Sequence, residues 1–164
     1  MGIVFEKVSF FKRGILYSML ADAYSFDCRI QESCEFDWLE FDNFFFDNLQ
    51  IADKCGFITK LYDEPIGFVS WDPRNMPEYV EIGHNCIVSK YKGNGYGRAQ
   101  LQEAVNRILQ GNVSKIIVTT NEALIPARRM YERVGFKIQQ NQENKNLNSI
   151  DFAGDLIDYV YYVQ

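Results

Sequence analysis

The chain has 164 residues, of which 47% are hydrophobic and 15% aromatic, and its formal net charge is -5. This length fits one domain over residues 1–164 with a single core, and the negative charge argues against a nucleic-acid-binding protein, which usually presents a basic face. The four cysteines form no C-x-x-C pair and the single histidine cannot complete a Cys/His zinc set, so we expect no metal site and reduced thiols.

The N-terminal segment lacks the basic region, apolar core and small-residue cleavage site of a secretory signal. No apolar run approaches the roughly 20 residues that cross a membrane. We therefore expect a cytoplasmic protein that binds neither nucleic acid nor membrane.

Hydrophobic periodicity divides the chain into strands and helices. Runs rich in β-branched and aromatic residues predict strands at 3–11, 56–62, 66–71, 78–88, 115–120, 136–140 and 158–163. Apolar residues three and four positions apart predict helices at 12–24, 37–52, 98–109 and 126–134. The order β-α-α-β-β-β-α-β-α-β-β is typical of an α/β or α+β domain around one mixed sheet.

Turn-forming residues separate these elements. Asp63-Glu64-Pro65 predicts a hairpin turn, and therefore antiparallel pairing of the strands beside it. Pro126 suits the first turn of a helix, and Gly135 suits a left-handed cap at its end. A polar loop rich in Asn is expected between the last two strands.

Acidic residues are concentrated between positions 22 and 53. One base, Arg29, stands against nine acids, which are Asp22, Asp27, Glu32, Glu35, Asp37, Glu40, Asp42, Asp47 and Asp53. A solvated helix face is the more common meaning of such a run. The functional alternative is the rim of a cleft that concentrates cationic substrates.

Three glycines, Gly93, Gly95 and Gly97, lie where the strand pattern gives way to a helical one. Glycine there allows a positive φ and the close approach of a ligand to the backbone. The helix that follows presents unpaired N–H groups and the positive end of its dipole. Together these features predict a site for a phosphate-bearing ligand.

The spacing of this turn excludes two common phosphate-binding motifs. Arg98 stands where the third glycine of the dinucleotide fingerprint G-x-G-x-x-G belongs, and no Walker sequence G-x-x-x-x-G-K-[ST] occurs. The segment Lys92-x-x-Gly95-x-Gly97 instead resembles the R/Q-x-x-G-x-G/A motif of the GNAT superfamily of acetyl-CoA-dependent N-acyltransferases. A second segment, residues 127–136, looks like that family's A-x-x-x-Y-E-x-x-G-F motif. Together with the strands and helices that accompany them in the family's order, the two motifs cover about half the chain.

The resemblance implies a mixed, mostly antiparallel central sheet flanked by about four helices, with acetyl-CoA as cosubstrate and an amine as acceptor. In the family, backbone amides equivalent to those around Cys86, Ile87 and Val88 hold the pantetheine arm and polarise the acetyl carbonyl. The residues that would wrap the pyrophosphate are Lys92, Gly93, Asn94, Gly95, Tyr96 and Gly97.

Two positions depart from the family pattern. Lys92 replaces the usual Arg or Gln, which keeps the charge but loses the guanidinium fork. The family often carries Asn seven residues before the tyrosine of the second motif, whereas this chain has Leu124 there. The nearest asparagine, Asn121, is the candidate for that cofactor contact.

Tyr131 is the candidate general acid, because the family's tyrosine at this position protonates the departing coenzyme A thiolate. A proton donor helps a thiolate with a reference pKa near 8.5 to leave. The structural alternative is a tyrosine whose ring packs in the core. Direct transfer to an amine needs no nucleophile, so Cys86 is better interpreted as a buried thiol than as an acetyl carrier.

The general base is less defined by the sequence. His84 has a suitable intrinsic pKa and lies on the strand expected to line the cleft, although a lone histidine is more often structural. Glu81 and Glu78 lie on the same predicted strand and compete for the role, and a water could relay the proton from any of them.

Three functions remain open at this point. The first is acetyl transfer to a small amine, with the acidic run at 22–53 favouring a cationic one. The second is acetylation of a protein N-terminus or lysine, which needs an open groove. The third is an acyl-CoA-binding regulatory module that uses Tyr131 structurally. The aromatic residues Trp38, Phe44–Phe46 and Trp71 suit an acceptor pocket, a core or a homodimer interface.

Overall fold

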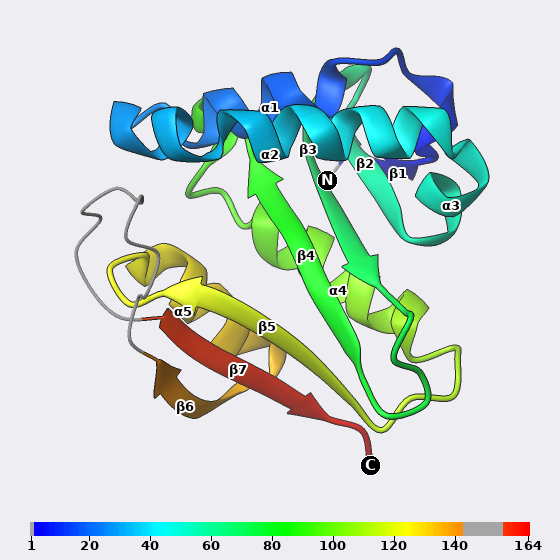
Figure 1. Ribbon diagram of the computed structural model, residues 1–164, viewed down its shortest axis with the longest axis vertical. Helices are drawn as coiled ribbons and strands as arrows, with labels where there is room; N and C mark the ends of the chain where they lie inside the picture. The colour runs from blue at the N-terminus through cyan, green and yellow to red at the C-terminus, as the bar shows by residue number, and fades with distance from the viewer. Residues whose placement is uncertain (1, 143–155) are drawn as a thin grey trace.

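The computed structural model describes residues 2–142 and 156–164, whose elements are drawn in Figure 1. Seven strands form one sheet in the order β1-β2-β3-β4-β5-β7-β6. Their bounds are β1 Ile3–Glu6, β2 Gly56–Leu61, β3 Glu64–Asp72, β4 Val80–Ile87, β5 Lys115–Asn121, β6 Lys137–Gln142 and β7 Leu156–Tyr162. All neighbouring strands are antiparallel except β4 and β5. The expected mixed, mostly antiparallel sheet is confirmed.

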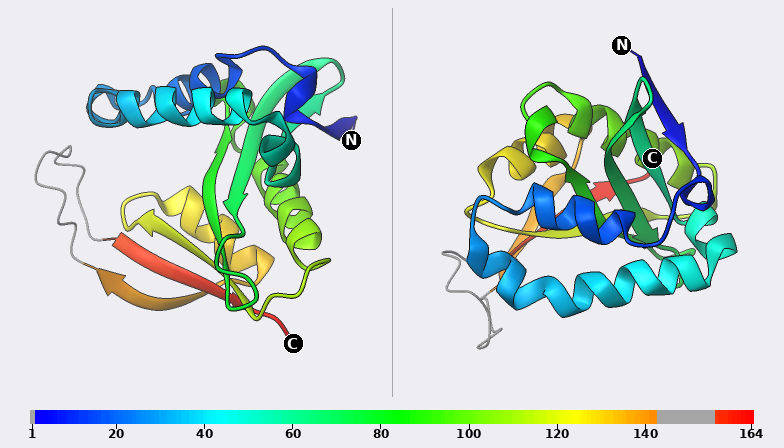
Figure 2. Two further views of the ribbon diagram at one scale, coloured as in Figure 1. Left: turned by 45° about the vertical axis from the view of Figure 1, so that its right-hand side comes forward. Right: turned by 90° about the horizontal axis from the view of Figure 1, so that it is seen from above.

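Helices cover both faces of this sheet (Figures 1 and 2). Those within the described residues are α1 Ile15–Ala23, α2 Cys28–Asp47, α3 Leu49–Lys54, α4 Tyr96–Ile108 and α5 Ile125–Val134. The first three lie over one face, and α4 and α5 lie over the opposite face. Strands and helices after residue 78 begin and end within about two residues of their predicted bounds, apart from the last strand pair.

The helix predicted over 37–52 is wrong in its start and in its continuity. The chain forms α2 and α3 instead, with a break at Asn48, whose φ of -136° and ψ of 61° are not helical. The Asn48 side-chain amide donates to the carbonyl of Phe44 at 2.9 Å. The earlier start is capped by Asp27, which accepts from the N–H of Arg29 at 3.0 Å. The polar first turns of α2 carry too few apolar residues for periodicity to reveal them.

The N-terminal half differs from the prediction at two further points. β1 ends at Glu6, and the rest of the predicted strand forms a short 3-10 turn at Val8–Phe10, where Ser9 N–H donates to Asp53 Oδ1 at 2.9 Å. The hairpin turn lies at Tyr62 and Asp63, so Glu64 and Pro65 belong to β3.

The last strand pair is longer than predicted. β6 and β7 pair in antiparallel register from Lys137↔Val160 to Gln142↔Leu156. The Asn-rich loop expected between them occupies residues 143–155, which lie outside the described part of the chain.

The junction of β4 and β5 positions the candidate site. Their parallel pairing comprises Val80↔Ile116 and Glu81↔Ile117, whereas β5 pairs with β7 along its whole length. Beyond Glu81 the two strands diverge (Figure 1), while β4 continues to pair with β3 as far as Ile87. One edge of the second half of β4 is therefore without a strand partner among the described residues.

Candidate functional site

Hydrogen bonding along β4 shows which backbone groups face the unpaired edge. Val88 N–H donates to the carbonyl of Ile66, just before Gly67 pairs with Ile87. Because residues of an antiparallel pair alternate in direction, Cys86 and Val88 direct their backbone groups towards β3, and Ile87 directs its own towards β5. Of the three residues expected to supply amides, Ile87 is the one whose N–H faces the unpaired edge.

The glycine turn joins β4 to α4. Gly93 and Gly95 have φ of +79° and +84°, values that side-chain-bearing residues rarely adopt. No described atom lies within 4 Å of the position that a Cβ would take at either glycine, so the space in front of the turn is open. Gly95 is the N-cap of α4, and no described side chain caps this 13-residue helix. The backbone thus has the geometry of an anion site.

Gly97 has a different role from the other two glycines. A Cβ at this position would lie 3.2 Å from Met130 Sδ and 3.5 Å from Ile87 Cγ1. The small residue therefore allows the first turn of α4 to pack closely against α5 and β4.

The Lys92 ammonium points towards α1 rather than towards the glycine turn. Its Nζ donates to the carbonyl of Ala23 and lies 4.9 Å from the centroid of the Phe26 ring. Burial lowers the pKa of Lys92. Ser89 completes this connection, because its N–H donates to Asp22 Oδ1 at 2.7 Å. Lys92 therefore links the end of α1 to the start of the glycine turn.

Asn94 and Tyr96 shape the turn through contacts of their own. Asn94 Nδ2 lies 3.2 Å from the carbonyls of Tyr91 and Lys92. The Tyr96 ring packs edge-on against Tyr91, with centroids 6.3 Å apart. These contacts hold the segment that presents the α4 N–H groups.

Tyr131 lies on α5 and is 5% exposed. Its ring packs between Phe136 and Tyr159, with centroid distances of 5.7 Å and 5.8 Å, and the Asn85 side chain lowers the pKa of its hydroxyl against the larger effect of burial. Burial raises the pKa of Tyr131 to about 12. The phenol therefore keeps its proton at neutral pH and is a competent hydrogen-bond donor.

Half-buried Asn85 and buried Gln100 form an amide pair that sequence reasoning missed. Gln100 is fully buried, and its Nε2 donates to Asn85 Oδ1 at 2.8 Å. A signal for it was present in the sequence. Leu101, Ala104 and Ile108 form the buried face of α4, and position 100 lies on that face at helical spacing. A polar residue there must find partners inside the protein.

Cys86 is 6% exposed, and burial raises the pKa of its thiol to about 12. The thiolate that a nucleophile requires is therefore scarce at neutral pH. Burial also raises the pKa of Tyr24 at the end of α1, with smaller contributions from Cys86 and Tyr131. These polar groups from α1, β4 and α5 thus lie near one another.

His84 occupies an apolar position on the α2 side of β4. Its ring centroid lies 4.4 Å from that of Phe41 and 6.2 Å from that of Phe68. The backbone N–H of His84 donates to Ser70 Oγ at 3.0 Å. Burial lowers the pKa of His84 to about 4, against a smaller opposing effect of Asp37. The imidazole is neutral at pH 7 but is a weak base.

This burial predicts a pH-dependent contribution of His84 to stability. Between its folded pKa of about 4 and the free value of about 6.5, the unfolded chain binds more protons. The free energy of unfolding should therefore fall as the pH decreases through this window, by up to about 3 kcal/mol relative to His84→Gln. Urea denaturation of both proteins at pH 7 and pH 4.5 measures the difference. Equal pH dependence of the two proteins would contradict the buried neutral imidazole.

Glu81, one of the carboxylates predicted as a base, lies where β4 parts from β5. It is half-buried, and it pairs with Ile117 where the β4–β5 ladder ends. Burial raises its pKa, and the charges of Asp72 and Asp158 raise it further. Glu78 is exposed and precedes β4. A carboxylate with a raised pKa is a stronger base, so Glu81 is favoured over Glu78 on this ground.

Asn121 ends β5 and forms the turn into α5. Its Oδ1 accepts from Ala123 N–H at 2.8 Å, and its carbonyl accepts from Leu124 N–H at 3.0 Å. The side chain therefore helps to set the start of the helix that carries Tyr131.

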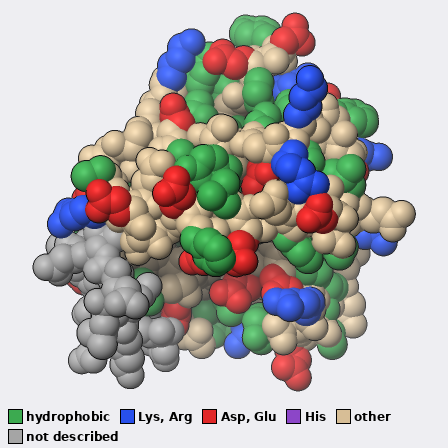
Figure 3. All heavy atoms as spheres, turned by 45° about the horizontal axis from the view of Figure 1, so that its top comes forward, with side chains coloured by type: hydrophobic (Ala, Val, Ile, Leu, Met, Phe, Trp, Pro, Cys, Tyr) green, Lys and Arg blue, Asp and Glu red, His purple; other side chains and the backbone are tan. Residues whose placement is uncertain are grey.

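Most acidic residues of the 22–53 run contact groups of the protein itself. Asp42, which is 3% exposed, accepts from the N–H groups of Gly14 and Leu16 at 2.8 Å and 3.0 Å and so caps α1 from α2. Other members with polar partners are Asp22, Asp27, Glu35, Asp47 and Asp53. Figure 3 shows acidic side chains spread over this side of the molecule among apolar ones. Asp37 is the member whose charge acts on His84.

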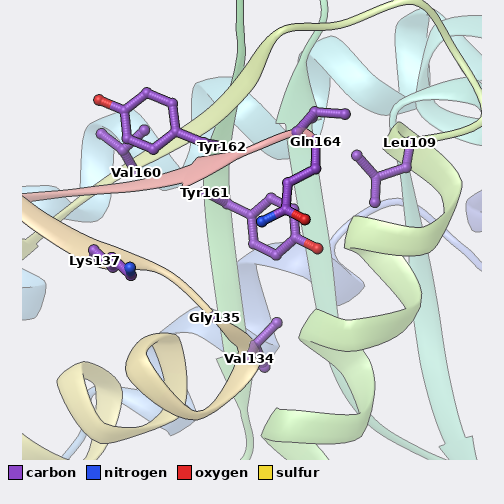
Figure 4. Close-up of a pocket in the computed structure, with 9 residues that line it drawn as sticks. Leu109, Val134, Gly135, Lys137, Val160, Tyr161, Tyr162 and Gln164 are labelled. Atoms are coloured by element: carbon purple, nitrogen blue, oxygen red, sulfur yellow. The ribbon is translucent and has the colours of Figure 1, made fainter.

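A separate hollow lies at the other end of β5 (Figure 4). Its walls come from the ends of α4, α5 and β7 and from the start of β6, and they include Leu109, Val134, Lys137, Tyr161 and Gln164. The register Lys115↔Tyr162 places it near the start of β5, whereas Asn121 ends that strand. The hollow is therefore distinct from the site beside β4.

The described residues contain no group of three or more His, Cys, Asp or Glu side chains able to hold a metal ion. Among these same residues, no helix is both long and apolar enough to cross a membrane.

Comparison with known proteins shows which family shares this arrangement. The family model described as "Acetyltransferase (GNAT) family" matches residues 16–136. A curated relative, N-acetylaspartate synthetase of Danio rerio, is 23% identical over 84 residues, which cover 51% of this chain and 30% of the relative. The chain thus spans about a third of the length of that relative.

Solved structures share the fold over nearly the whole chain. A GNAT family acetyltransferase from Elizabethkingia anophelis with acetyl-CoA bound superposes with a TM-score of 0.71 at 17% identity, covering 99% of each chain. The NatC complex bound to Gag peptide and CoA superposes with a TM-score of 0.70 at 18% identity, covering 100% of each chain. At these identities the likeness concerns the fold.

Proposed function

Because the chain belongs to the acetyltransferase (GNAT) family, we propose that it transfers the acetyl group of acetyl-CoA directly to a primary amine. One observation carries the proposal. At Gly97 the glycine turn packs against both Ile87, on the unpaired edge of β4, and Met130, the neighbour of Tyr131 on α5. The residues present fit the cosubstrate, because open space and left-handed glycines at the turn suit a pyrophosphate.

Acetyl-CoA supplies a thioester whose carbonyl carbon accepts an amine, so the chain's own residues must bind, orient and move protons. The Gly93–Gly97 backbone and the α4 N-terminus bind the pyrophosphate. The Ile87 N–H donates to the carbonyl oxygen as negative charge develops on it. As the C–N bond forms and the C–S bond breaks, Tyr131 donates its proton to the leaving sulfur.

The amine must lose a proton for the reaction to balance. Glu81 lies six residues before Ile87 on β4, about 20 Å along an extended strand, so it accepts this proton through a chain of waters and passes it to solvent. Tyr131 then recovers a proton from solvent. The raised pKa of Glu81 supports this role, and the pKa of about 4 at His84 makes the imidazole the weaker choice. His84 then has a structural role, because its ring packs against Phe41 and Phe68 on the α2 side of β4.

The proposed acceptor is a small primary amine, with a cationic one favoured by Asp37 and the acidic surface of α2. Fewer acidic residues support a cationic acceptor than the sequence implied, because Asp42 and other acids of the 22–53 run bind groups of the protein itself. A peptide amine is the alternative, and the NatC structure was solved with a peptide. An acyl-CoA-binding module without catalysis is the third outcome.

Calorimetry with acetyl-CoA, followed by a thiol-release assay over a panel of amines, tests the proposal. The panel contains polyamines, free amino acids and short peptides with free N-termini. We expect acetyl-CoA binding and thiol release stimulated by a small amine. Release stimulated by peptides but not by small amines would support the peptide alternative. Acetyl-CoA binding without thiol release by any amine would contradict the proposed acetyl transfer and would support the acyl-CoA-binding module.

Cytoplasmic location and homodimer formation, which were predicted from the sequence, stay predictions. α2 exposes Phe36 and Phe44, with 69% and 49% of their surfaces accessible, and such residues suit a symmetric contact. Light scattering after size-exclusion chromatography measures the mass. A monomer at micromolar concentration would contradict the homodimer.

A further inference from the structure

We propose that Asn85 is a positioning residue, which donates a hydrogen bond to the Tyr131 oxygen and so leaves the phenolic hydrogen available for the leaving thiolate. The inference rests on the proposed acetyl transfer. It comes from a chain of buried hydrogen bonds that begins at Thr59 on β2, passes through Gln100 on α4 and reaches Asn85 on β4.

The orientation of the Gln100 amide is determined by its partners. Its Nε2 faces the carbonyls of Phe68 and Cys86 at 2.8 Å and 3.1 Å. Carbonyls accept hydrogen bonds and cannot donate them, so the nitrogen and not the oxygen of Gln100 must lie on this side. Oε1 then lies on the other side, where Thr59 Oγ1 donates to it at 2.7 Å.

The Gln100 orientation in turn determines that of Asn85. Gln100 Nε2 donates to Asn85 at 2.8 Å, so the accepting atom must be Oδ1. Asn85 Nδ2 is then directed away from α4 towards α5, where it lies 3.8 Å from Met130 Sδ. Tyr131 follows Met130 on that helix, and the Asn85 side chain lowers the pKa of its phenol, which is the effect of an amide nitrogen directed at the phenolic oxygen.

The consequence for Tyr131 follows from the direction of this bond. An amide nitrogen donates, so the phenolic oxygen is the acceptor and the phenolic hydrogen is not used by Asn85. The same bond stabilises the phenolate that forms once the proton has left, and it lowers the pKa of Tyr131 against the larger effect of burial. Asn85 thus sets both the direction and the strength of the proposed acid.

A double-mutant cycle tests the proposal through thiol release with saturating amine. Asn85→Leu removes the donor at similar volume and should lower kcat about 10- to 100-fold, the range of a hydrogen bond to a charged group, with KM for acetyl-CoA changed less than about threefold. In the Tyr131→Phe background the same substitution should change kcat less than about twofold. Asn106→Leu, on the exposed face of α4, is the matched control.

If the two decreases in kcat multiply in the double variant, the positioning role is overturned, because Asn85 would then act independently of Tyr131. A loss confined to KM would overturn it too. If Asn85→Leu does not fold, Asn85→Ser, whose shorter side chain cannot bridge Gln100 and Tyr131, replaces it in the same cycle. Wild-type protein without amine-stimulated thiol release contradicts the proposed function itself, whereas active wild type with multiplying losses contradicts the Asn85 role alone.

Discussion

Replacing Tyr131 by phenylalanine is expected to lower kcat about 100-fold while KM for acetyl-CoA changes little. General acid catalysis contributes about 10²- to 10⁴-fold to such reactions, and the lower part of this range applies where water can partly replace the acid. The phenylalanine ring would keep the contacts with Phe136 and Tyr159, so the free energy of unfolding should fall only by about 1 kcal/mol, the contribution of the proposed hydrogen bond with Asn85. Steady-state thiol release and thermal denaturation of both proteins measure the two effects.

Tyr162→Phe is the matched control, because Tyr162 is 59% exposed at the end of β7 and lies away from the β4 edge. Its turnover should equal that of the wild type. The acid role of Tyr131 would be refuted by unchanged turnover of Tyr131→Phe across pH 6 to 10, since a ring that only packs does not need its hydroxyl.

Replacing Gly95 by valine is expected to raise KM for acetyl-CoA at least about 10-fold. Gly95 has a φ of +84°, and a β-branched side chain there introduces about 1–3 kcal/mol of backbone strain. The chain relieves this strain by moving the turn, which displaces the α4 N–H groups from the pyrophosphate. Isothermal titration with coenzyme A measures the affinity directly.

Gly95→Asn separates backbone strain from side-chain bulk. Asparagine tolerates the left-handed region, so Gly95→Asn should lose less affinity for coenzyme A than Gly95→Val, and its remaining loss measures the bulk of a side chain in the space proposed for the pyrophosphate. Equal and large losses for Val and Asn would mean that a ligand fills this space. Unchanged affinity of Gly95→Val would contradict the pyrophosphate site.

The parts of the fold that were predicted well depend on local features. Pro126 and Gly135 bracket α5, and Gly135 adopts the expected left-handed conformation with a φ of +117°. The glycine turn was located for the same reason, since positive φ is a property of single residues. The break at Asn48 was missed because apolar residues continue at helical spacing across it, at Phe45, Leu49 and Ala52. Asn48 interrupts the helix through its own backbone conformation and side-chain bond.

The sequence could not rank His84 and Glu81 as general bases, because burial changes the pKa of each side chain. His84 and Glu81 are three residues apart on one strand, and their intrinsic pKa values favour the histidine. Packing against Phe41 and Phe68 moves the histidine pKa down to about 4, and burial with two nearby carboxylates moves that of Glu81 up. Those neighbours come from other elements of the sheet and from α2.

The sequence by itself determined the family resemblance, the glycine turn and the position of Tyr131, because each is carried by short-range spacing. Only the tertiary structure decided that Ile87 presents its N–H to the unpaired edge, that Lys92 points to α1, and that Asn85 lies between Gln100 of α4 and Met130 of α5. The physical reason is separation along the chain. Gln100 lies 15 residues from Asn85 and 41 from Thr59, and folding alone brings their amide and hydroxyl groups together in the interior.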